Sequence, residues 1–365
     1  MTKKTISISL LQDADIPELL DFYNLINKDN RDKEKFLWEF YNAPAGKAIY
    51  VIAKDADTQK IIGSQCAIPV DLITHTGDVI RTGKSEDTLV HPDYRGLSIF
   101  ENMYAMLFEK CRESGIKYLW GFTSAKKPFL RLGFTIPFDH SQSLMVLNIF
   151  SSYKYLSNLN AKNTTGSLLK IFALCFLARL ISFKRYWPSS PSLKNKFSFS
   201  AYDKSVVKEN NLIPENKYKG YWIKQDISYI SWRIEKNPYL EGVHNVYFSR
   251  ASDIVANLIF NHHKNGTWYL INDTYADGIT ADEKAMMMKK SIALLAGKKQ
   301  TSVNLIRAWD FRHNQHGLDE IQERKKAGFF HLDRGISFVW KSLDPDDMLD
   351  AMDFNLSRLA SQGTI

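Results

Sequence analysis

The chain has 365 residues, 44% of them hydrophobic and 24% charged, which predicts two globular domains and excludes wholesale disorder. Its net charge of +8 favours an anionic partner, such as a phosphate-bearing cofactor, an anionic membrane or nucleic acid. The three cysteines match neither a metal site nor a disulfide framework, and the N-terminus lacks the apolar stretch of a signal peptide, so we expect a cytoplasmic protein.

The first half of the chain has the pattern of a mixed α/β domain. Alternating or continuous apolar runs predict strands, and apolar residues at helical spacing predict helices. Strands are expected at Thr5–Leu10, Ala48–Ala53, Ile61–Thr74, Asp78–His91, Lys117–Phe122 and Phe134–Asn148, and helices at Asp13–Lys28, Lys33–Tyr41, Ile99–Arg112 and Ser124–Leu132.

The stretch Asp87–Phe100, which reads DTLVHPDYRGLSIF, is the main functional candidate. A strand passes through a tight Arg-Gly turn into the start of a helix. The free backbone N–H groups of a helix start, together with about half a positive charge from the helix dipole, favour a bound phosphate. Glycine also lets a ligand approach the backbone closely. We therefore predict a phosphate-binding turn at Arg95–Gly96.

The segment Ala161–Trp187 is strongly apolar but is interrupted and flanked by lysines and arginines. Its apolar part is too short and too interrupted for a membrane-spanning helix. Two interpretations remain open. The segment is either a helix packed between two domains or an amphipathic helix whose residues 168–185 contact a membrane surface. The stretch Pro188–Ser200 then predicts a linker.

The second half of the chain echoes the first. Trp38 is followed six positions later by a proline, and so is Trp232. Gly133 lies 95 residues after the first tryptophan and Gly328 lies 96 residues after the second, each glycine followed by phenylalanine. The same order of elements recurs between these landmarks, which indicates a tandem duplication. We interpret both tryptophans as core residues.

The elements expected in the second half follow the same pattern rules. Strands are expected at Ile254–Phe260, Thr267–Asp273, Ser302–Arg307 and Phe330–Trp340, and helices at Ala281–Leu295 and Gln315–Ala327.

The first 150 residues resemble the GCN5-related N-acetyltransferase (GNAT) superfamily. The matching residues are Val90, Pro92, Arg95 and Gly96 of a V-x-P-x-x-R-G turn, the helix after it, and LRLGF at Leu130–Phe134. The whole chain is similar to bacterial tandem members of this superfamily. The resemblance implies an α/β fold with a mixed sheet in each of two tandem GNAT-like domains, and acetyl-CoA as the co-substrate.

The resemblance also implies a set of ligand contacts. The backbone of Leu89 and Val90 would meet the pantetheine arm, and the Val90 N–H would donate to the thioester oxygen as an oxyanion donor. The turn and helix start would hold the pyrophosphate through Arg95, Gly96, Leu97, Ser98, Ile99 and Phe100.

The chain departs from the family pattern at four positions. Ser98 and Phe100 stand where the family's phosphate loop carries glycines. Ser124 stands where an asparagine is frequent. Phe129 stands where many members carry a tyrosine that protonates the leaving thiolate. We include Ser124 and Phe129 among the predicted cofactor-binding residues.

The second half has no Arg-Gly turn. The sequence DTYADGITADEK stands between its central strand and the following helix, and these acidic residues would repel a pyrophosphate. We therefore predict an acetyl-CoA-binding GNAT-like domain at 1–150, an apolar helix and linker at 151–200, and a second, degenerate GNAT-like domain at 201–365.

Acetyl transfer to an amine needs a base that accepts the amine proton. Glu86 and Asp87 lie on the strand before the turn. Strand alternation sends their side chains to opposite faces, and a bulge would change that assignment. We predict Asp87 as the catalytic base, with Glu86 as the alternative.

The sequence thus predicts an N-acetyltransferase that transfers acetyl directly from acetyl-CoA to a small-molecule primary amine, such as an amino sugar. One alternative is another acyl or aminoacyl transferase on the doubled fold. The others are a non-catalytic module with a CoA-shaped groove, and a membrane-associated assembly protein acting through Leu168–Phe183. We expect no metal ion and no nucleic-acid partner, and no motif indicates the oligomeric state.

Overall fold

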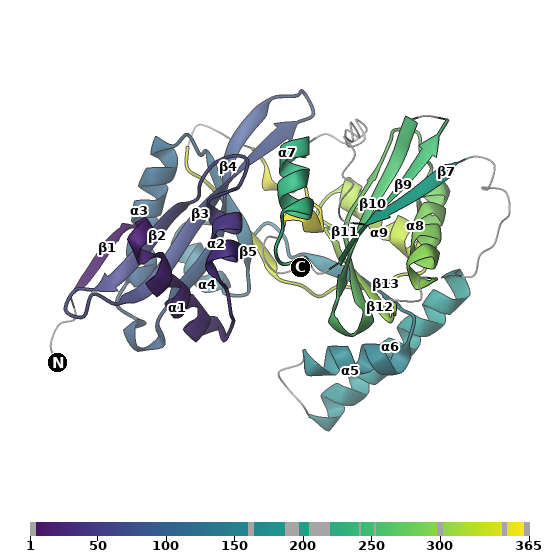
Figure 1. Ribbon diagram of the computed structural model, residues 1–365, viewed down its shortest axis with the longest axis horizontal. Helices are drawn as coiled ribbons and strands as arrows, with labels where there is room; N and C mark the ends of the chain where they lie inside the picture. Colours follow the sequence, from purple (N-terminus) through teal and green to yellow (C-terminus); the bar gives the residue numbers. More distant parts are fainter. Residues whose placement is uncertain are drawn as a thin grey trace.

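The computed structural model describes residues 5–159, 164–186, 197–203, 220–240, 242–251, 253–297, 302–344 and 349–360. Two mixed sheets lie side by side, one built mainly from the first half of the chain and one mainly from the second (Figure 1). The first sheet has the order β1-β2-β3-β4-β5-β14, with β8 (Tyr221–Ile223) paired to β3 and β15 (Phe354–Asn355) paired to β8. The second has the order β13-β6-β12-β11-β10-β9-β7. The predicted α/β class is confirmed.

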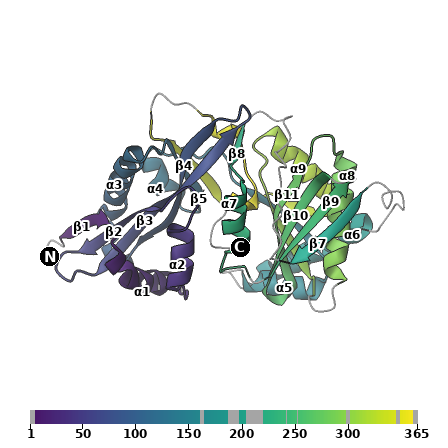
Figure 2. The same ribbon diagram turned by 45° about the horizontal axis from the view of Figure 1, so that its top comes forward.

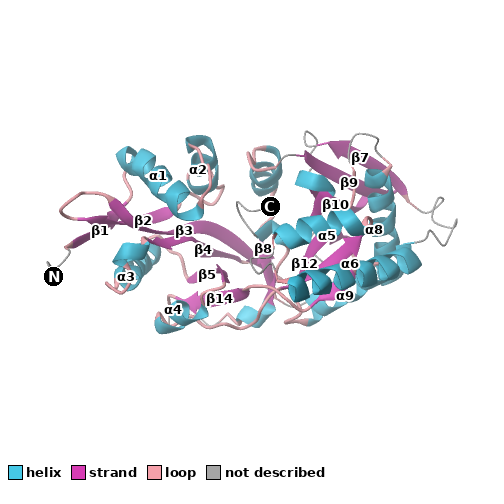
Figure 3. Ribbon diagram, turned by 90° about the horizontal axis from the view of Figure 1, so that it is seen from below, coloured by secondary structure: helices cyan, strands magenta, loops and turns pink. Residues whose placement is uncertain are grey.

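The first domain contains the elements that the sequence predicts up to its last strand. Helices α1 and α2 cover one face of its sheet, and α3 and α4 lie on the other (Figure 3). The strands are β1 (Ile6–Leu10), β2 (Ile49–Asp55), β3 (Ile61–Thr74), β4 (Val79–Val90) and β5 (Tyr118–Thr123), and the helices are α1 (Ile16–Asn27), α2 (Lys33–Phe40), α3 (Ile99–Glu113) and α4 (Lys126–Arg131).

The second domain repeats this plan with longer helices. Its sheet includes the first-half strand β6 (Ser141–Val146), which lies between β12 and β13. Its own strands are β7 (Ser198–Asp203), β9 (Gly242–Arg250), β10 (Asp253–His263), β11 (Thr267–Tyr275), β12 (Leu305–Asp310) and β13 (Phe330–Leu332), and its helices are α8 (Ala281–Ala296) and α9 (Gln315–Ala327).

The two halves exchange their last strands, which pattern analysis did not predict. The expected first-half strand Phe134–Asn148 is shorter in the structure, because only β6 is extended, and β6 pairs antiparallel with β12 of the second sheet. In return, β14 (Ser337–Ser342) pairs antiparallel with β5 of the first sheet. The expected strand Phe330–Trp340 is accordingly divided into β13 and β14.

The crossing segments contact each other where the strands change sheets. The N–H of Ile336 donates to Nδ1 of His140 at 2.7 Å, and the N–H of His140 donates to the Ile336 carbonyl at 3.0 Å. A Cβ on Gly335 would lie 1.8 Å from His140 Nδ1, so this crossing requires glycine. The exchange ties the two domains together through backbone pairing.

A second junction joins helical segments from the two halves of the chain, α2 and the turn that contains Trp232. The helix α7 (Ile227–Ile230), continued by a π-helical turn, lies between the two sheets (Figures 1 and 2). The indole of Trp38 donates to the carbonyl of Trp232 at 2.9 Å, and Trp232 donates back to Trp38 at 2.8 Å. Their rings stack at 5.2 Å. Both side chains are buried, so the repeated tryptophans form the symmetric core contact between the copies.

The apolar segment after β6 forms a helical hairpin, α5 (Ile149–Asn158) and α6 (Thr165–Tyr186). It lies below the second sheet in the view of Figure 1 and in front of it when seen from below, apart from the helices of the first domain (Figures 1 and 3). The interpretation of this segment as a helix between two domains is therefore wrong, since α6 contacts β6, β13 and α9. Most of the expected linker Pro188–Ser200 lies outside the described residues.

Candidate active site

The turn between β4 and α3 exposes backbone donors at the start of a helix. Arg95, Gly96, Leu97 and Ser98 are all exposed, and α3 begins directly afterwards. Gly96 has a φ of 83° and Ser98 a φ of 56°, both in the left-handed region. The Ser98 side chain makes no capping hydrogen bond to the helix. The N–H groups of the first helical turn therefore remain available to an anion.

Ser98 and Phe100, which stand where the family pattern has glycines, do not block the turn. Ser98 adopts the left-handed conformation that glycine would adopt, so the backbone path is kept. The ring of Phe100 packs against Tyr104 at 4.8 Å and Phe129 at 5.7 Å. Phe100 thus turns toward the core and leaves the turn open, and the buried Ile99 does the same.

Two contacts hold the turn in place. Tyr94 donates from its hydroxyl to Asp55 at 2.6 Å, which ties the turn to the end of β2. Nδ1 of His91 accepts from the Asp93 N–H at 3.3 Å, so this histidine caps the short 3-10 turn Pro92–Tyr94. His91 therefore acts as a structural turn residue in this conformation.

The central parallel strands separate just before this turn. β4 and β5 pair only through Thr82–Lys84 and Tyr118–Trp120. The His91 N–H donates to Ile62 of β3 at 2.8 Å. Because successive N–H groups of a strand point to opposite edges, the Val90 N–H points away from β3, toward the edge where β5 has separated. This orientation is the one expected of an oxyanion donor.

A bulge changes the predicted orientation of the two carboxylates. The register between β3 and β4 shifts opposite Asp87, whose φ is 51°. Asp87 contacts Tyr50, and Glu86 pairs with Lys84, so both carboxylates lie on the face of the sheet that α1 and α2 cover. The prediction that they point to opposite faces is wrong, because the extra residue in the bulge resets the alternation.

The two carboxylates differ in how free they are. Asp87 accepts two hydrogen bonds from Arg31 and one from the Tyr50 hydroxyl at 2.9 Å, and its side chain is 8% exposed. Glu86 is 31% exposed and pairs through one oxygen with Lys84. Asp87 is thus a structural anchor for Arg31, while Glu86 keeps an accessible carboxylate oxygen.

Sequence reasoning missed Glu39, a buried carboxyl beside this cluster. Burial raises its pKa to about 7, the guanidinium of Arg31 opposes that shift, and Asp87 and Glu86 add to it. Tyr239 of the second half donates to Glu39 at 3.5 Å. The available signal was its position three residues after Phe36, on the apolar face of α2.

On the opposite face, α3 contributes a buried hydroxyl that sequence reasoning also missed. Tyr104 lies within 2.7 Å of the Ser85 hydroxyl and 3.4 Å of the Thr88 hydroxyl. Burial raises the pKa of Tyr104, which keeps the phenol protonated. Phe129 packs beside it at 5.8 Å and is buried in the same aromatic cluster. Ser124 is exposed, and α4 begins two residues later than predicted.

The second copy has the same strand separation, but charged side chains fill it. Arg324 donates to Asp310 at 2.7 Å and to Asp273 at 2.8 Å, so it bridges the ends of β12 and β11. His331 contacts Asp310 at 2.7 Å. The side chains of Arg324, Asp273 and Asp310 are all buried or nearly buried.

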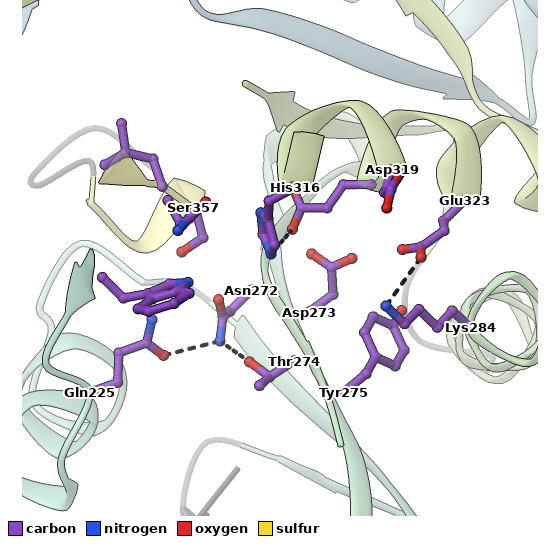
Figure 4. Close-up of a pocket in the computed structure, with 14 residues that line it drawn as sticks. Gln225, Asn272, Asp273, Thr274, Tyr275, Lys284, His316, Asp319, Glu323 and Ser357 are labelled. Carbon is purple, nitrogen blue, oxygen red and sulfur yellow. Dashed lines mark hydrogen bonds and ion pairs between the residues drawn. The ribbon is translucent and has the colours of Figure 1, made fainter. Parts of the chain in front are cut away.

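A pocket of about 70 Å³ lies beside this bridge (Figure 4). Asp273, Asp319, Glu320 and Glu323 line it, with Lys284 paired to Glu323 at 3.1 Å. Burial raises the pKa of Glu320 to about 8, with Arg324 opposing that shift. Such an acidic lining is unsuited to a pyrophosphate.

Side chains also occupy backbone N–H groups at the start of α8. The Thr280 hydroxyl accepts from the Glu283 N–H at 3.3 Å, and the Glu283 carboxylate accepts from the Thr280 N–H at 2.9 Å. This capping box uses the donors that α3 leaves free.

Comparisons with known proteins agree with this geometry. The sequence profile described as "Acetyltransferase (GNAT) domain" matches residues 7–136. No curated protein sequence matches the chain. Among solved structures, a tandem GNAT protein from the clavulanic acid biosynthesis pathway is similar at a TM-score of 0.57 and 10% identity, covering 94% of this chain and 100% of that one.

Two further structures show the same fold. A conserved protein of unknown function from Enterococcus faecalis V583, described as a probable N-acyltransferase, is similar at a TM-score of 0.60 and 9% identity, over 93% of this chain and 73% of that one. The N-myristoyltransferase of Saccharomyces cerevisiae with bound myristoyl-CoA is similar at a TM-score of 0.57 and 13% identity, over 96% and 89%. At such identities the likeness concerns the fold.

Proposed function

We propose that this chain, whose residues 7–136 match the acetyltransferase (GNAT) domain profile and whose doubled fold is similar to a tandem GNAT protein, transfers acetyl from acetyl-CoA directly to a primary amine. The family match supports acyl transfer from a coenzyme A thioester. The acetyl group and the amine acceptor, an amino sugar or another small amine, are our proposals. The observation that carries the coenzyme A site is the uncapped helix start of α3 beside an open strand edge.

The turn fits the pyrophosphate of the co-substrate. The N–H groups after Gly96 converge at the positive end of the α3 dipole, and Arg95 is exposed beside them. A Cβ at Gly96 would contact no protein atom within 4 Å, so the space above this residue is open to a ligand. The charge-assisted hydrogen bonds of an arginine to phosphate are among the stronger ones in proteins.

The reaction needs three further contributions from the chain. Glu86 accepts the proton of the attacking amine, because it is the accessible carboxylate of the cluster. The Val90 N–H stabilises the oxyanion that forms on the acyl carbonyl. The Tyr104 phenol returns a proton to the leaving thiolate through the half-buried Thr88 hydroxyl, 3.4 Å away, because Phe129 has no group to perform this role.

Calorimetric titration with acetyl-CoA tests the proposal. We expect binding by the wild type and a loss of at least about tenfold in affinity for Arg95→Glu, because a cation next to the phosphates becomes an anion. Arg250→Glu is the matched control, an exposed arginine on β9 of the second domain. No binding by the wild type, or equal affinity of both variants, contradicts the proposed site.

A screen of amine acceptors with released thiol as the readout then tests the reaction itself. Binding without thiol release from any amine would favour the non-catalytic alternative. Faster release with a longer acyl-CoA would correct the acyl group while leaving the site in place.

A further inference from the structure

The excess positive charge of the chain is confined to one segment. Residues 140–202 contain eight lysines and arginines and no aspartate or glutamate. The chain as a whole has 48 basic and 40 acidic residues, so the remainder is balanced. The net charge of +8 is therefore a property of the α5–α6 segment and its flanks, where it favours an anionic surface.

The same segment exposes a continuous apolar stripe. On α6 the exposed apolar side chains recur at helical spacing and lie on one face: Leu169, Phe172, Phe176, Leu177, Leu180 and Phe183. Only 17% of the window Thr165–Phe183 is buried, although its mean hydropathy is 1.8. By length and composition this window is the one stretch of the described chain that suits a membrane.

Helix α5 extends this stripe. Phe150 is 76% exposed and Leu159 is also exposed. Tyr153 of α5 meets Phe172 of α6 edge to face at 5.6 Å, so the outer surfaces of the two helices are continuous. The exposed Lys154 and Lys170 accompany this surface.

The inner face of the hairpin fixes its orientation. Cys175, Ala178 and Ser182 are fully buried, and the Ser182 hydroxyl donates to the Gly328 carbonyl at 3.0 Å. Ala178 and Tyr155 pack with Leu144 of β6. A helix whose second half is held against a sheet by these buried residues does not cross a bilayer while folded in this way, but its outer face can lie on one.

We propose that α5 and α6 form a docking surface for an anionic lipid bilayer, with the apolar stripe in the headgroup region and the exposed Lys154 and Lys170 against lipid phosphates. Two observations select this occupant. A second copy of the chain would bring two equally basic segments together, which like-charge repulsion opposes. An anionic bilayer complements both the charge and the apolar stripe.

Vesicle sedimentation of the full chain tests this surface. We expect co-sedimentation with phosphatidylcholine vesicles that contain phosphatidylglycerol, much less with phosphatidylcholine alone, and weakening by salt. The triple variant Phe172→Ser, Phe176→Ser, Leu180→Ser should bind at least about tenfold more weakly, since three apolar side chains no longer enter the bilayer. The control triple Leu25→Ser, Val79→Ser, Ile227→Ser removes exposed apolar side chains elsewhere and should bind as the wild type does.

A charge variant keeps the test decisive if the triple variant fails to fold. Lys154→Glu with Lys170→Glu changes two exposed residues and should weaken binding to the anionic vesicles by at least about tenfold. The proposal is overturned by an absence of wild-type sedimentation with anionic vesicles, or by unchanged binding of the charge variant. It is equally overturned if the chain without lipid is a dimer that the triple variant dissociates, because the stripe is then a contact between copies.

Discussion

The two copies of the fold differ most where their central parallel strands separate. Each copy has one parallel ladder of three residue pairs. Counted from the first pair of each ladder, Thr88 and Thr123 of the first copy correspond to Asp273 and Asp310 of the second. The first copy thus has small hydroxyl side chains on both sides of the opening, and the second has a carboxylate on each side.

The residue that closes the second opening also has a counterpart. Arg324 lies four positions before Gly328, and Phe129 lies four positions before Gly133. Phe129 packs into the aromatic cluster of the first domain, whereas Arg324 bridges the two carboxylates. The same duplicated position therefore holds an apolar core residue in the first copy, Phe129, and a member of a buried ion network in the second, Arg324.

The helix starts show the same division. The first turn of α3 has no side-chain cap, while α8 has a complete capping box. The second copy thus satisfies, within the protein, the helix-start groups that the side chains of the first copy leave uncapped.

The largest expected effect separates the copies by activity. Glu86→Gln should lower turnover by about 10²–10⁴-fold, because an amide does not accept the amine proton. Affinity for acetyl-CoA should persist. Glu320→Gln, a buried glutamate of the second copy, should leave turnover unchanged. Steady-state rates of thiol release measure both. If the two substitutions reduce turnover equally, the assignment of the chemistry to the first copy is wrong.

The next effect concerns stability at the duplicated position. Arg324→Met should reduce the free energy of unfolding by about 3–5 kcal/mol, because Asp273 and Asp310 lose their buried counter-charge. Phe129→Met at the corresponding position should cost about 1.5 kcal/mol or less, since one apolar side chain replaces another. Urea denaturation measures both, and a smaller cost for Arg324→Met than for Phe129→Met would refute the bridge.

Each copy holds a carboxyl with a raised pKa, the buried Glu39 in the first and the largely buried Glu320 in the second. Burial raises the pKa of Glu39 to about 7 and that of Glu320 to about 8, from an ordinary value of 4.5. The stability that each protonated form contributes is complete below the ordinary value and is lost as the pH rises through the folded-state value.

Replacement of either glutamate by glutamine should remove its part of that pH dependence. Between about pH 5 and about pH 8 the wild type should therefore lose more stability than Glu39→Gln or Glu320→Gln does. Unfolding curves at several pH values measure this. Curves for wild type and variants that stay parallel over this range would show that neither carboxyl is protonated in the fold.

The smallest expected effect is at the helix starts. Thr280→Ala should destabilise the protein by about 1 kcal/mol, because the capping box is lost. Ser98→Ala should change stability by less than about 0.5 kcal/mol, since this side chain makes no cap and both residues carry a Cβ at a left-handed φ. Thermal denaturation compares them, and equal losses would mean that Ser98 does cap α3.

Much of the site was predictable from local pattern. The alternation before Val90, the Arg-Gly turn and the helical spacing after Ser98 predicted β4, the turn and α3, because these elements depend on neighbouring residues. The spacing of Trp38 and Trp232 predicted the duplication, and the structure adds that these tryptophans bond to each other.

The catalytic details were not predictable in the same way. The bulge at Asp87 turned both carboxylates to one face, and Arg31, 56 positions away, engaged Asp87 and left Glu86 accessible. Glu39 and Tyr104 became visible only when burial and contacts were known. These facts depend on residues distant in sequence, whose approach no local period describes.

By itself, then, the sequence determined the element order and the strand, turn and helix around Arg95–Gly96, since each depends on propensity and spacing within a short stretch. The repeated landmarks in the two halves determined the duplicated plan. The tertiary structure alone decided the exchange of β6 and β14 and the exposure of α6. Each sheet offers a strand edge of the same kind, β5 in the first and β12 in the second. The local sequence of β6 and β14 therefore does not determine which of the two edges each strand pairs with. Likewise, α6 carries apolar side chains of its own both on the buried face and on the exposed face. Only the position of the second sheet determines which of these faces stays exposed.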